Sequence, residues 1–356
     1  RLVQMWSQPR RMIYAEFDRT GNEVLAVGPD GRSRLWNVRT GKPAPEFFGH
    51  GHDLEKASFS PDGAFVVTCA ENQNLATVWE RATGKPVATL SHDTNVYHAA
   101  FSPGGDRIVT AVGDHTAILW NFKTSEKVHK LARHTDVVTH AAFDFNGRRI
   151  VTASRDRTAI VWNAETGAPL MTLRGHNSWV YYATFSPDGR YVATGSFDRT
   201  ARVWDVQTGN EIFRVQHGNA VRSAEFSPNG GFLLTAGWDF SVRVWNLKNQ
   251  RQEIPPLKVN SKVMRATFSP DGRRILSVDW NGSVRIWELD SAASLPPVTP
   301  SRFSPDGERF VVVTNQVLEV KDAVTRTSIC SIAAANPAGS DSLFNQDGTL
   351  LLSVGK

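Results

Sequence analysis

The sequence predicts an all-β fold built from a repeat of about 42 residues, because two aromatic residues recur with the same period. Between the two aromatic positions lie turn residues and short β-branched runs, whereas a helical repeat needs longer amphipathic segments. The recurring tryptophans are Trp36, Trp79, Trp120, Trp162, Trp204, Trp245 and Trp287. The recurring phenylalanines are Phe17, Phe59, Phe101, Phe143, Phe185, Phe226 and Phe268.

The fourth unit illustrates the elements expected in each repeat. A turn at 144–147 precedes a strand at 149–153, a second strand covers 158–162, a turn follows at 166–167, and an outer strand covers 169–173. Four short strands per repeat, each bounded by turn residues, form one blade of a β-propeller. The segment Ser-Pro-Asp-Gly recurs at 60–63, 186–189, 269–272 and 304–307. Its proline and glycine suit a tight turn, and strands on both sides argue against a phosphate-binding loop, which leads into a helix.

The resemblance to a known family rests on the fifth unit. Gly175-His176, Ser186 to Gly189, Asp198 and Val203 to Asp205 resemble the WD-repeat family, and the match covers nearly the whole chain. The turn style is similar to that of bacterial members, which are often appended to kinases or signalling ATPases. That similarity implies a place in a larger signalling protein.

Four units share a histidine, a threonine, an aspartate and a tryptophan at fixed offsets. A hydroxyl, an imidazole and a carboxylate could suggest a catalytic triad, but an active site is normally built once and this set recurs in register. The resemblance implies a structural chain from Asp to His to Thr to Trp within each blade. The four sets are His92, Thr110, Asp114 and Trp120; His134, Thr152, Asp156 and Trp162; His176, Thr194, Asp198 and Trp204; and His217, Thr235, Asp239 and Trp245.

The remaining units depart from this pattern. The second keeps His50 but has Gln73 near the aspartate position, the seventh has Val259 where histidine belongs, and the first has Gln8 there. We expect these blades to be tied less rigidly. The other histidines are scattered singly, so no metal site and no cofactor are predicted.

The spacing after Trp287 predicts where the ring closes. Only 16 residues separate Trp287 from Phe303, too few for an outer strand, a crossing and a new inner strand. Residues 3–6 align with an outer strand, so they are expected to complete the seventh blade and leave no free edge. The predicted domains are a seven-bladed propeller at 1–288, a linker at 289–300 and incomplete repeats of a further propeller at 301–356. One enlarged ring of eight or nine blades is the alternative.

Composition limits the environment of the protein. The chain has no apolar run near the ~18 residues of a membrane-spanning helix, and Cys69 and Cys330 are its only cysteines. Both observations favour a cytoplasmic protein without a membrane partner. The net charge of +5 raises the question of nucleic acid, but the basic residues are spread along the chain rather than concentrated.

Three functions follow from these observations. The first is a non-catalytic platform or scaffold that binds protein partners. The second is a nucleic-acid-binding propeller, which the dispersed charge disfavours. The third is an enzyme with a site in the central channel, which would need unlike and unrepeated acids, bases or metal ligands. The positions assigned so far are repeated or apolar, so no catalytic residue is predicted.

The partner-binding residues are predicted from tryptophans outside the repeat period. The resemblance implies that docking residues flank the apolar position five before the repeat phenylalanine, or directly precede the loop aspartate. Blade two offers Asp53 and Glu55 there, so an acidic sector is expected opposite an aromatic and basic patch centred on blades five to seven. The predicted patch consists of Trp179, Tyr181, Phe197, Arg222, Trp238, Lys262, Met264 and Trp280, with Tyr97 on blade three and Arg155 on blade four.

Overall fold

The computed structural model describes residues 1–7, 12–43, 54–70 and 73–289 with their side chains, and the backbone of strands between 302 and 354. The chain divides into two compact units, Arg1–Ser294 and Leu295–Lys356. The described residues form strands and turns and contain no helix, so none of them provides an apolar helix that could cross a membrane.

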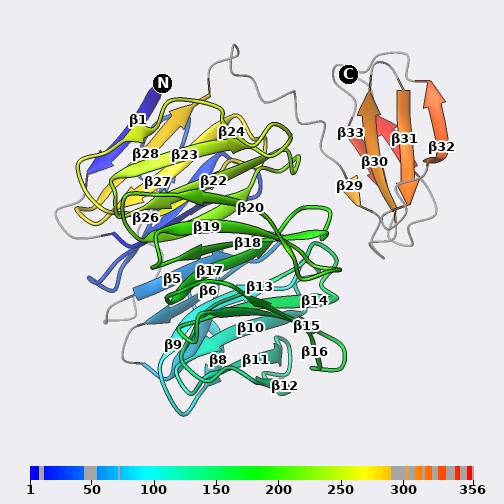
Figure 1. Ribbon diagram of the computed structural model, residues 1–356. Helices are drawn as coiled ribbons and strands as arrows, with labels where there is room; N and C mark the ends of the chain where they lie inside the picture. The colour runs from blue at the N-terminus through cyan, green and yellow to red at the C-terminus, as the bar shows by residue number, and fades with distance from the viewer. Residues whose placement is uncertain are drawn as a thin grey trace. The chain divides into compact units, whose positions relative to one another are not determined.

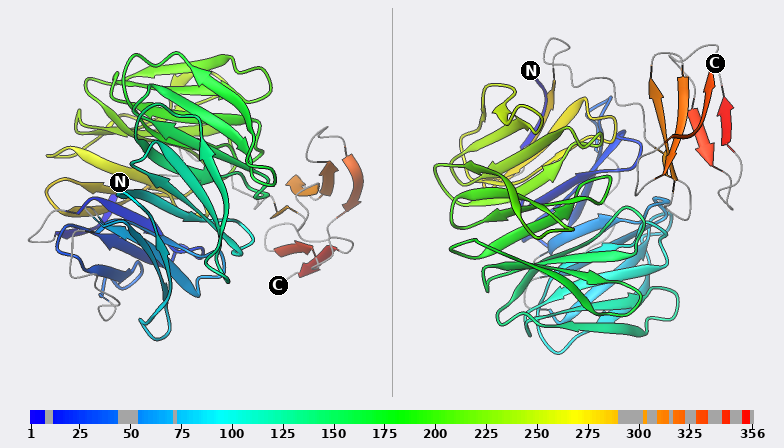
Figure 2. Two further views of the ribbon diagram at one scale, coloured as in Figure 1. Left: turned by 90° about the horizontal axis from the view of Figure 1, so that it is seen from below. Right: turned by 45° about the vertical axis from the view of Figure 1, so that its right-hand side comes forward.

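The first unit is a seven-bladed β-propeller, in which the sheets follow one another around a centre (Figures 1 and 2). Blade one contains β2 (Tyr14–Phe17), β3 (Glu23–Val27) and β4 (Ser33–Asn37), and blade two contains β5 (Leu54–Phe59), β6 (Phe65–Ala70), β7 (Leu75–Glu80) and β8 (Pro86–Ser91). Blade three contains β9 (Val96–Phe101), β10 (Arg107–Val112), β11 (Thr116–Asn121) and β12 (Lys127–Ala132), and blade four contains β13 (Val138–Phe143), β14 (Arg149–Ser154), β15 (Thr158–Asn163) and β16 (Pro169–Arg174). Blade five contains β17 (Val180–Phe185), β18 (Tyr191–Ser196), β19 (Thr200–Asp205) and β20 (Glu211–Gln216). Blade six contains β21 (Val221–Phe226), β22 (Phe232–Gly237), β23 (Ser241–Asn246), β24 (Arg251–Gln252) and β25 (Leu257–Lys258). Blade seven contains β26 (Val263–Phe268), β27 (Arg274–Asp279) and β28 (Ser283–Glu288), and its sheet also includes β1 (Leu2–Ser7).

The two repeated aromatic residues mark the first and third strands of each blade. In blade four, Phe143 ends β13 and Trp162 lies near the end of β15. The core lies between neighbouring blades: one cluster joins Val109 and Leu119 of blade three to Ile150 of blade four. Because each blade has neighbours on both faces, its strands alternate less between apolar and polar residues and are nearly continuous apolar runs. Burial between blades therefore explains why the runs seen in the sequence are apolar and short.

The outer strand of blade six is divided into the short β24 and β25. Pro255 and Pro256 lie between the two parts. Proline has no backbone N–H to donate to the sheet, so two successive prolines interrupt the pairing with β23. The single outer strand predicted for each repeat is therefore wrong in this blade.

A β-bulge occurs near the start of the inner strand in six blades. In β17, Val180 pairs with Ser196 and Tyr182 with Gly195, so Tyr181 is the extra residue. A bulge bends the strand and redirects a side chain. The extra residues of the six bulges are Glu55, Tyr97, Thr139, Tyr181, Arg222 and Met264.

The strand β1 pairs antiparallel with β28, in a register that places Leu2 opposite Trp287 and Ser7 opposite Ser283. Trp6 stacks on Trp36 of blade one with ring centroids 5.2 Å apart, and its indole N–H donates to the carbonyl of Gly41 at 2.9 Å. The beginning of the chain thus contacts both blade seven and blade one.

The second unit contains two sheets. One comprises β29 (Arg302–Phe303), β30 (Arg309–Thr314), β31 (Val317–Asp322) and β32 (Ser328–Ala333), and the other comprises β33 (Asp341–Phe344) and β34 (Leu351–Val354). The seven blades of the first unit do not include these strands, so the alternative of one enlarged ring is wrong. Most of the predicted linker, residues 290–300, lies outside the described residues.

Candidate functional site

The repeated polar residues form a hydrogen-bonded chain in blades four, five and six. In blade five, the ring Nδ1 of His176 is 2.8 Å from Asp198 Oδ2, and its Nε2 is 2.7 Å from Thr194 Oγ1. The Trp204 indole N–H donates to the same threonine oxygen at 2.8 Å. Burial is the main cause that lowers the pKa of His176, so the ring is neutral at pH 7. A neutral imidazole has one donor and one acceptor, so Nδ1–H donates to the aspartate and Nε2 accepts from the threonine.

Blades four and six repeat this geometry. His134 lies 2.7 Å from Asp156 and 2.7 Å from Thr152. His217 lies 3.1 Å from Asp239 and 2.8 Å from Thr235. Trp162 and Trp245 each donate to the threonine of their blade at 2.8 Å.

Blade three departs from the chain expected from the sequence. His92 Nε2 lies 2.8 Å from Thr110, and Trp120 donates to that threonine at 3.0 Å, but the buried Nδ1 of His92 has no hydrogen-bond partner among the described residues. Asp114 instead accepts from Thr116 at 2.5 Å and from Lys130 at 2.9 Å. The predicted link from Asp114 to His92 is therefore wrong, because a lysine on β12 holds the carboxylate. Burial lowers the pKa of His92 to about 4.

A second repeated contact was missed in the sequence. An arginine two residues before the repeat tryptophan pairs with an aspartate in four blades; this aspartate lies in the adjoining loop in three of them and at the end of β27 in blade seven. Arg202 is 3.3 Å from Asp198 and 2.9 Å from Glu211, and it is almost fully buried. The other pairs are Arg34 with Asp30, Arg243 with Asp239, and Arg285 with Asp279. The recurring spacing of arginine and tryptophan was the available signal.

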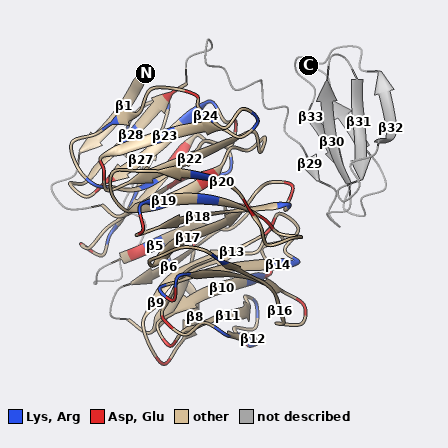
Figure 3. Cartoon of the chain, in the orientation of Figure 1, with Lys and Arg blue, Asp and Glu red and all other residues tan. Residues whose placement is uncertain are grey.

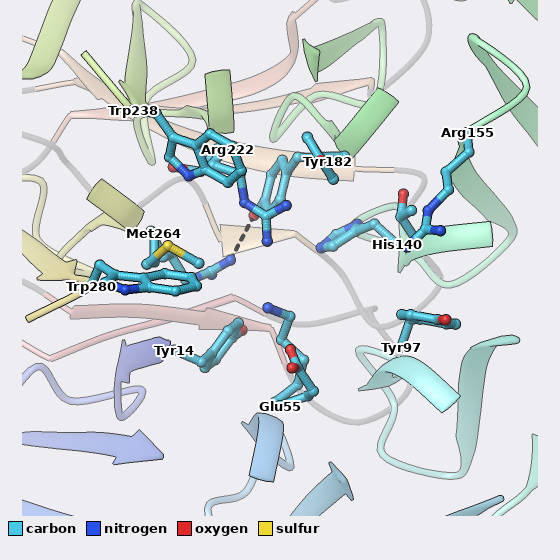
Figure 4. Close-up of a pocket in the computed structure, with 15 residues that line it drawn as sticks. Tyr14, Glu55, Tyr97, His140, Arg155, Tyr182, Arg222, Trp238, Met264 and Trp280 are labelled. Carbon is cyan, nitrogen blue, oxygen red and sulfur yellow. Dashed lines mark hydrogen bonds between the residues drawn. The ribbon is translucent and has the colours of Figure 1, made fainter. Parts of the chain in front are cut away.

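A cavity of about 240 Å³ lies where the inner strands converge (Figure 4). We call it the central cavity. All six bulge residues line it, because each bulge turns its extra side chain toward the centre. Tyr14 of blade one, Arg155, Trp238 and Trp280 also line it. The structure thus brings seven of the ten predicted docking residues to one cavity: Tyr97, Arg155, Tyr181, Arg222, Trp238, Met264 and Trp280.

The predicted docking residues form a continuous series of ring contacts, which we call the aromatic–cation ladder. Its members are Tyr97, Arg155, Trp179, Tyr181, Phe197, Arg222, Trp238, Lys262 and Trp280. Arg155 lies between the rings of Tyr97, at 5.6 Å, and Trp179, at 4.9 Å. Lys262 lies 4.5 Å from the ring of Trp238 and 5.8 Å from that of Trp280.

The exposure of the ladder differs from residue to residue. Trp179, Phe197 and Trp280 are 40%, 41% and 36% exposed. Met264, which was expected to be an exposed docking residue, is buried and packs in the core with Trp6 and Ile286. Met264 flanks the apolar position five before Phe268, as the resemblance implied, but its side chain packs between blades seven and one.

The charges around the central cavity are unbalanced. Among the described residues, no carboxylate lies within ion-pair distance of Lys56, Arg155 or Lys262. Of the residues that the structure describes, Glu55 is the one acidic residue that lines the cavity. Asp53, the second residue of the expected acidic sector, lies outside the described residues. Elsewhere basic and acidic residues are interspersed on the blades (Figure 3).

Beneath the docking residues lies a ring that the sequence analysis missed. Three residues before each repeat phenylalanine stand Tyr14, Lys56, His98, His140, Tyr182, Ser223 and Arg265. These side chains are unlike and mostly titratable, and they were not among the repeated or apolar positions assigned from the sequence. The signal in the sequence was this constant offset from the phenylalanine. In six blades the preceding residue is the extra residue of a β-bulge.

Two carboxylates stabilise this ring. Glu225 accepts from Thr267 at 2.6 Å and Tyr182 at 3.3 Å, and lies 3.5 Å from Arg265. Glu16 accepts from the backbone N–H of Phe59 at 2.7 Å and from Tyr14 at 3.0 Å. Burial raises the pKa of Glu16 to about 7 and lowers that of Lys56 to about 8.

The imidazoles of His98 and His140 stack at 3.9 Å, and burial holds the pKa of each well below its usual value. Among the described residues, no group of three or more His, Cys, Asp or Glu is placed to hold a metal ion.

Comparisons with known proteins agree with this architecture. A family model described as the IFT122 first β-propeller matches residues 137–299, and the model of the WD domain, G-beta repeat, matches residues 41–77 and 84–121. An uncharacterized WD repeat-containing protein of Schizosaccharomyces pombe is 37% identical over 54 residues, 15% of this chain and 18% of that protein. An uncharacterized WD repeat-containing protein of Synechocystis is 31% identical over 67 residues, 19% of each chain. The matched segments thus cover less than a fifth of either relative.

Proposed function

We propose that this chain, which belongs to the WD-repeat family of β-propellers, is a non-catalytic platform that binds a protein partner through the aromatic–cation ladder, chiefly on blades five to seven. The observation that carries this proposal is the ladder itself. Its members stand at equivalent positions of the repeat but have unlike side chains, and they contact one another in series around one cavity.

The chemistry of the ladder suits a protein interface. Large aromatic residues and arginine dominate the binding energy of many interfaces when a partner buries them. Trp179, Phe197 and Trp280 remain more than a third exposed although each is large and apolar. Contiguous apolar surface of this kind on a globular domain marks a binding site more often than an accident of packing.

The polar groups of the propeller support binding rather than catalysis. The His–Asp–Thr contacts recur in three blades, and Glu16 and Glu225 each accept at least two hydrogen bonds from neighbouring groups. Both carboxylates are held by donors of the chain itself, and neither lines the central cavity. The repeated contacts therefore have a structural role in this proposal, and the residues of the central cavity bind.

The domain arrangement belongs to the same proposal. The strand β1 closes the seventh blade, which its pairing with β28 supports, and residues 301–356 begin a second, incomplete propeller, which the four-stranded sheet β29–β32 supports. We place the protein in the cytoplasm. Cys69, the one cysteine whose side chain is described, is free and buried, as suits a reducing compartment.

The test is a triple substitution. Trp179→Ala, Trp238→Ala and Trp280→Ala together should abolish the capture of partners from a native lysate, because the ladder loses its three indole rings. The control is Val87→Ala, Leu170→Ala and Ile212→Ala, which removes three apolar side chains of greater exposure from outer strands. Capture of partners by the folded triple tryptophan variant, at the level of the control, would place the docking surface elsewhere.

The nucleic-acid alternative is tested on the same variants. A partner fraction that resists nuclease and is insensitive to moderate salt agrees with protein binding. Retention on heparin that falls steeply with salt and is unchanged by the tryptophan substitutions agrees with nucleic-acid binding instead.

A further inference from the structure

We propose that the central cavity takes the carboxylate side chain of an acidic peptide segment, so that the partner of this propeller is recognised by an aspartate or glutamate flanked by apolar residues. This inference rests on the proposed function and specifies the chemistry of the partner.

The charges that line the cavity select an anion. Among the described residues, four basic side chains and one acidic side chain, that of Glu55, line it. Arg265 is paired with Glu225 at 3.5 Å, so the excess of positive charge comes from the other basic residues. Opposite charges within a partly closed, low-dielectric space attract more strongly than at an open surface. The four basic residues are Lys56, Arg155, Arg222 and Arg265.

Unsatisfied donors in the cavity wall point to the same ligand. The indole N–H of Trp238 and the Nε–H of Arg155 are buried and have no hydrogen-bond partner among the described residues. Both groups are donors only, so an acceptor must satisfy them. A buried donor without a partner is costly, and a carboxylate has two oxygens with which to remove that cost.

Lys56 is the basic group best placed to anchor the ligand. Its ammonium lies 5.2 Å from the ring of Tyr14, and no described carboxylate is within ion-pair distance. Burial lowers its pKa to about 8, since the charge is desolvated and Glu55 compensates only in part. A bound carboxylate would supply the missing counter-charge.

The flanking residues favour a peptide over a nucleic acid. Bases bind such surfaces by stacking on open aromatic faces. Here Arg155 lies over Trp179, Arg222 over Tyr181 and Lys262 over Trp238, so cations cover rings that a base would need. A volume of about 240 Å³ also suits one side chain rather than a chain of nucleotides.

The experiment selects binders from a displayed library of random twelve-residue peptides, using the full chain as the target. We expect enrichment of peptides with an aspartate or glutamate beside apolar residues. An enriched peptide, fluorescently labelled, is then measured by anisotropy against its Asp→Asn or Glu→Gln counterpart and its phosphoserine counterpart. The counterpart without the charge should bind at least about tenfold more weakly, as expected for truncating a buried charge pair.

Variants of the protein locate the site. Lys56→Met and Arg155→Ala should each weaken the acidic peptide at least about fivefold and reduce the dependence of binding on salt. Neither residue has a carboxylate partner, so neither substitution strands a charge. Lys123→Ala is the control, because it removes one exposed charge from the turn between β11 and β12. Circular dichroism confirms that each variant is folded.

The possible failures are distinct. Enrichment of neutral or basic peptides that the triple tryptophan variant no longer binds would overturn the carboxylate inference and leave the proposed function standing. Tighter binding of the phosphoserine counterpart, or of a labelled twenty-nucleotide single strand, would overturn the choice of a carboxylate. Selected peptides that bind the triple tryptophan variant as well as the wild type would contradict both proposals.

Discussion

Two regions of the propeller use similar residues in opposite ways. We call the repeated His–Asp–Thr and Arg–Asp contacts within the blades the flank, and the aromatic–cation ladder with the bulge residues around the central cavity the rim. On the flank, Arg202 is buried against two carboxylates, and His176 has partners on both ring nitrogens. On the rim, Arg155 is stacked between aromatic rings with no carboxylate nearby, and its Nε has no acceptor. The contacts of Arg202 and His176 are satisfied within the chain and stabilise the fold, whereas the buried Nε–H of Arg155 is left available to an acceptor from outside the chain.

The two regions differ in whether the same residue type recurs from blade to blade. The flank contacts recur from blade to blade at one offset, as expected for a device that fixes blade geometry. The rim residues occupy equivalent positions too, but their identities change from Glu55 through Tyr97 and Thr139 to Arg222. Equivalent backbone with unlike side chains is how one scaffold presents a specific surface.

Removing the first strand should have the largest effect on the ring. Deleting residues 1–7 exposes the edge of β28 and takes away the indole that stacks on Trp36. We expect lower solubility and a fall in melting temperature greater than any single substitution described below causes. Met5→Ser, at an exposed position of the same strand, is the control. An unchanged melting temperature after the deletion would show that β1 does not close the ring.

Removing a buried arginine of the flank should lower the free energy of unfolding more than removing an arginine exposed at the surface. Arg202→Ala removes the cation that Asp198 and Glu211 share, although His176 and Arg214 remain as their partners, and should cost about 1.5–3 kcal/mol in urea unfolding. Arg190→Ala, whose side chain is mostly exposed beside Asp205, should cost less than about 1 kcal/mol. Similar costs for the two would remove the distinction between a buried flank and an exposed surface.

The histidine of the flank should be structural. His176→Ala leaves Asp198 and Thr194 without one partner each and should lower stability by about 1–3 kcal/mol while partner capture persists. His92→Ala should cost less, since His92 bonds only the threonine. A hydrolytic activity that disappears with His176→Ala would instead assign the chain a catalytic role.

Acid should lower the free energy of unfolding of the propeller, because the buried histidines of the flank are neutral in the folded state. The pKa of His92 is lowered from 6.5 to about 4, and those of His176 and His217 are lowered as well, in each case mainly by burial. Between the folded and unfolded pKa values the unfolded chain binds more protons. The free energy of unfolding that these neutral histidines contribute is therefore fully present above pH 6.5 and is lost as the pH falls toward 4. The loss is at most about 1.4 kcal/mol per pH unit for each histidine.

The measurement is the urea midpoint between pH 7.5 and 4.5, with His92→Asn as the comparison. Thr110, Trp120, Lys127 and Asp114 are the groups that surround His92. The variant should show a smaller loss of stability on acidification than the wild type. An equal loss would assign the acid sensitivity to other groups.

Much of the fold and part of the site could be predicted from the sequence, because both follow from a strict repeat. The period places Trp162 and Phe143 in their strands, and the offset from the repeat residues places Trp179 and Trp238 on the rim. The repeat could not show where one blade departs from the others. Lys130, a long-range neighbour on β12, takes Asp114 from His92, and two prolines divide the outer strand of blade six.

The inward ring was overlooked for a related reason. Strict alternation along a strand would turn only one of two successive residues toward the centre, whereas the bulge at Tyr181 lets both it and Tyr182 line the cavity. Met264 shows the reverse error, because it was expected to be an exposed docking residue but its flexible side chain is buried in the core.

The most direct test of the account measures melting temperature and partner capture together for two variants. The triple tryptophan variant of the rim should lose capture and keep a cooperative transition near that of the wild type. His176→Ala of the flank should melt at a lower temperature and, below that temperature, capture partners normally. If capture instead falls in proportion to stability in both variants, the flank and the rim do not have separate roles, and the account is contradicted.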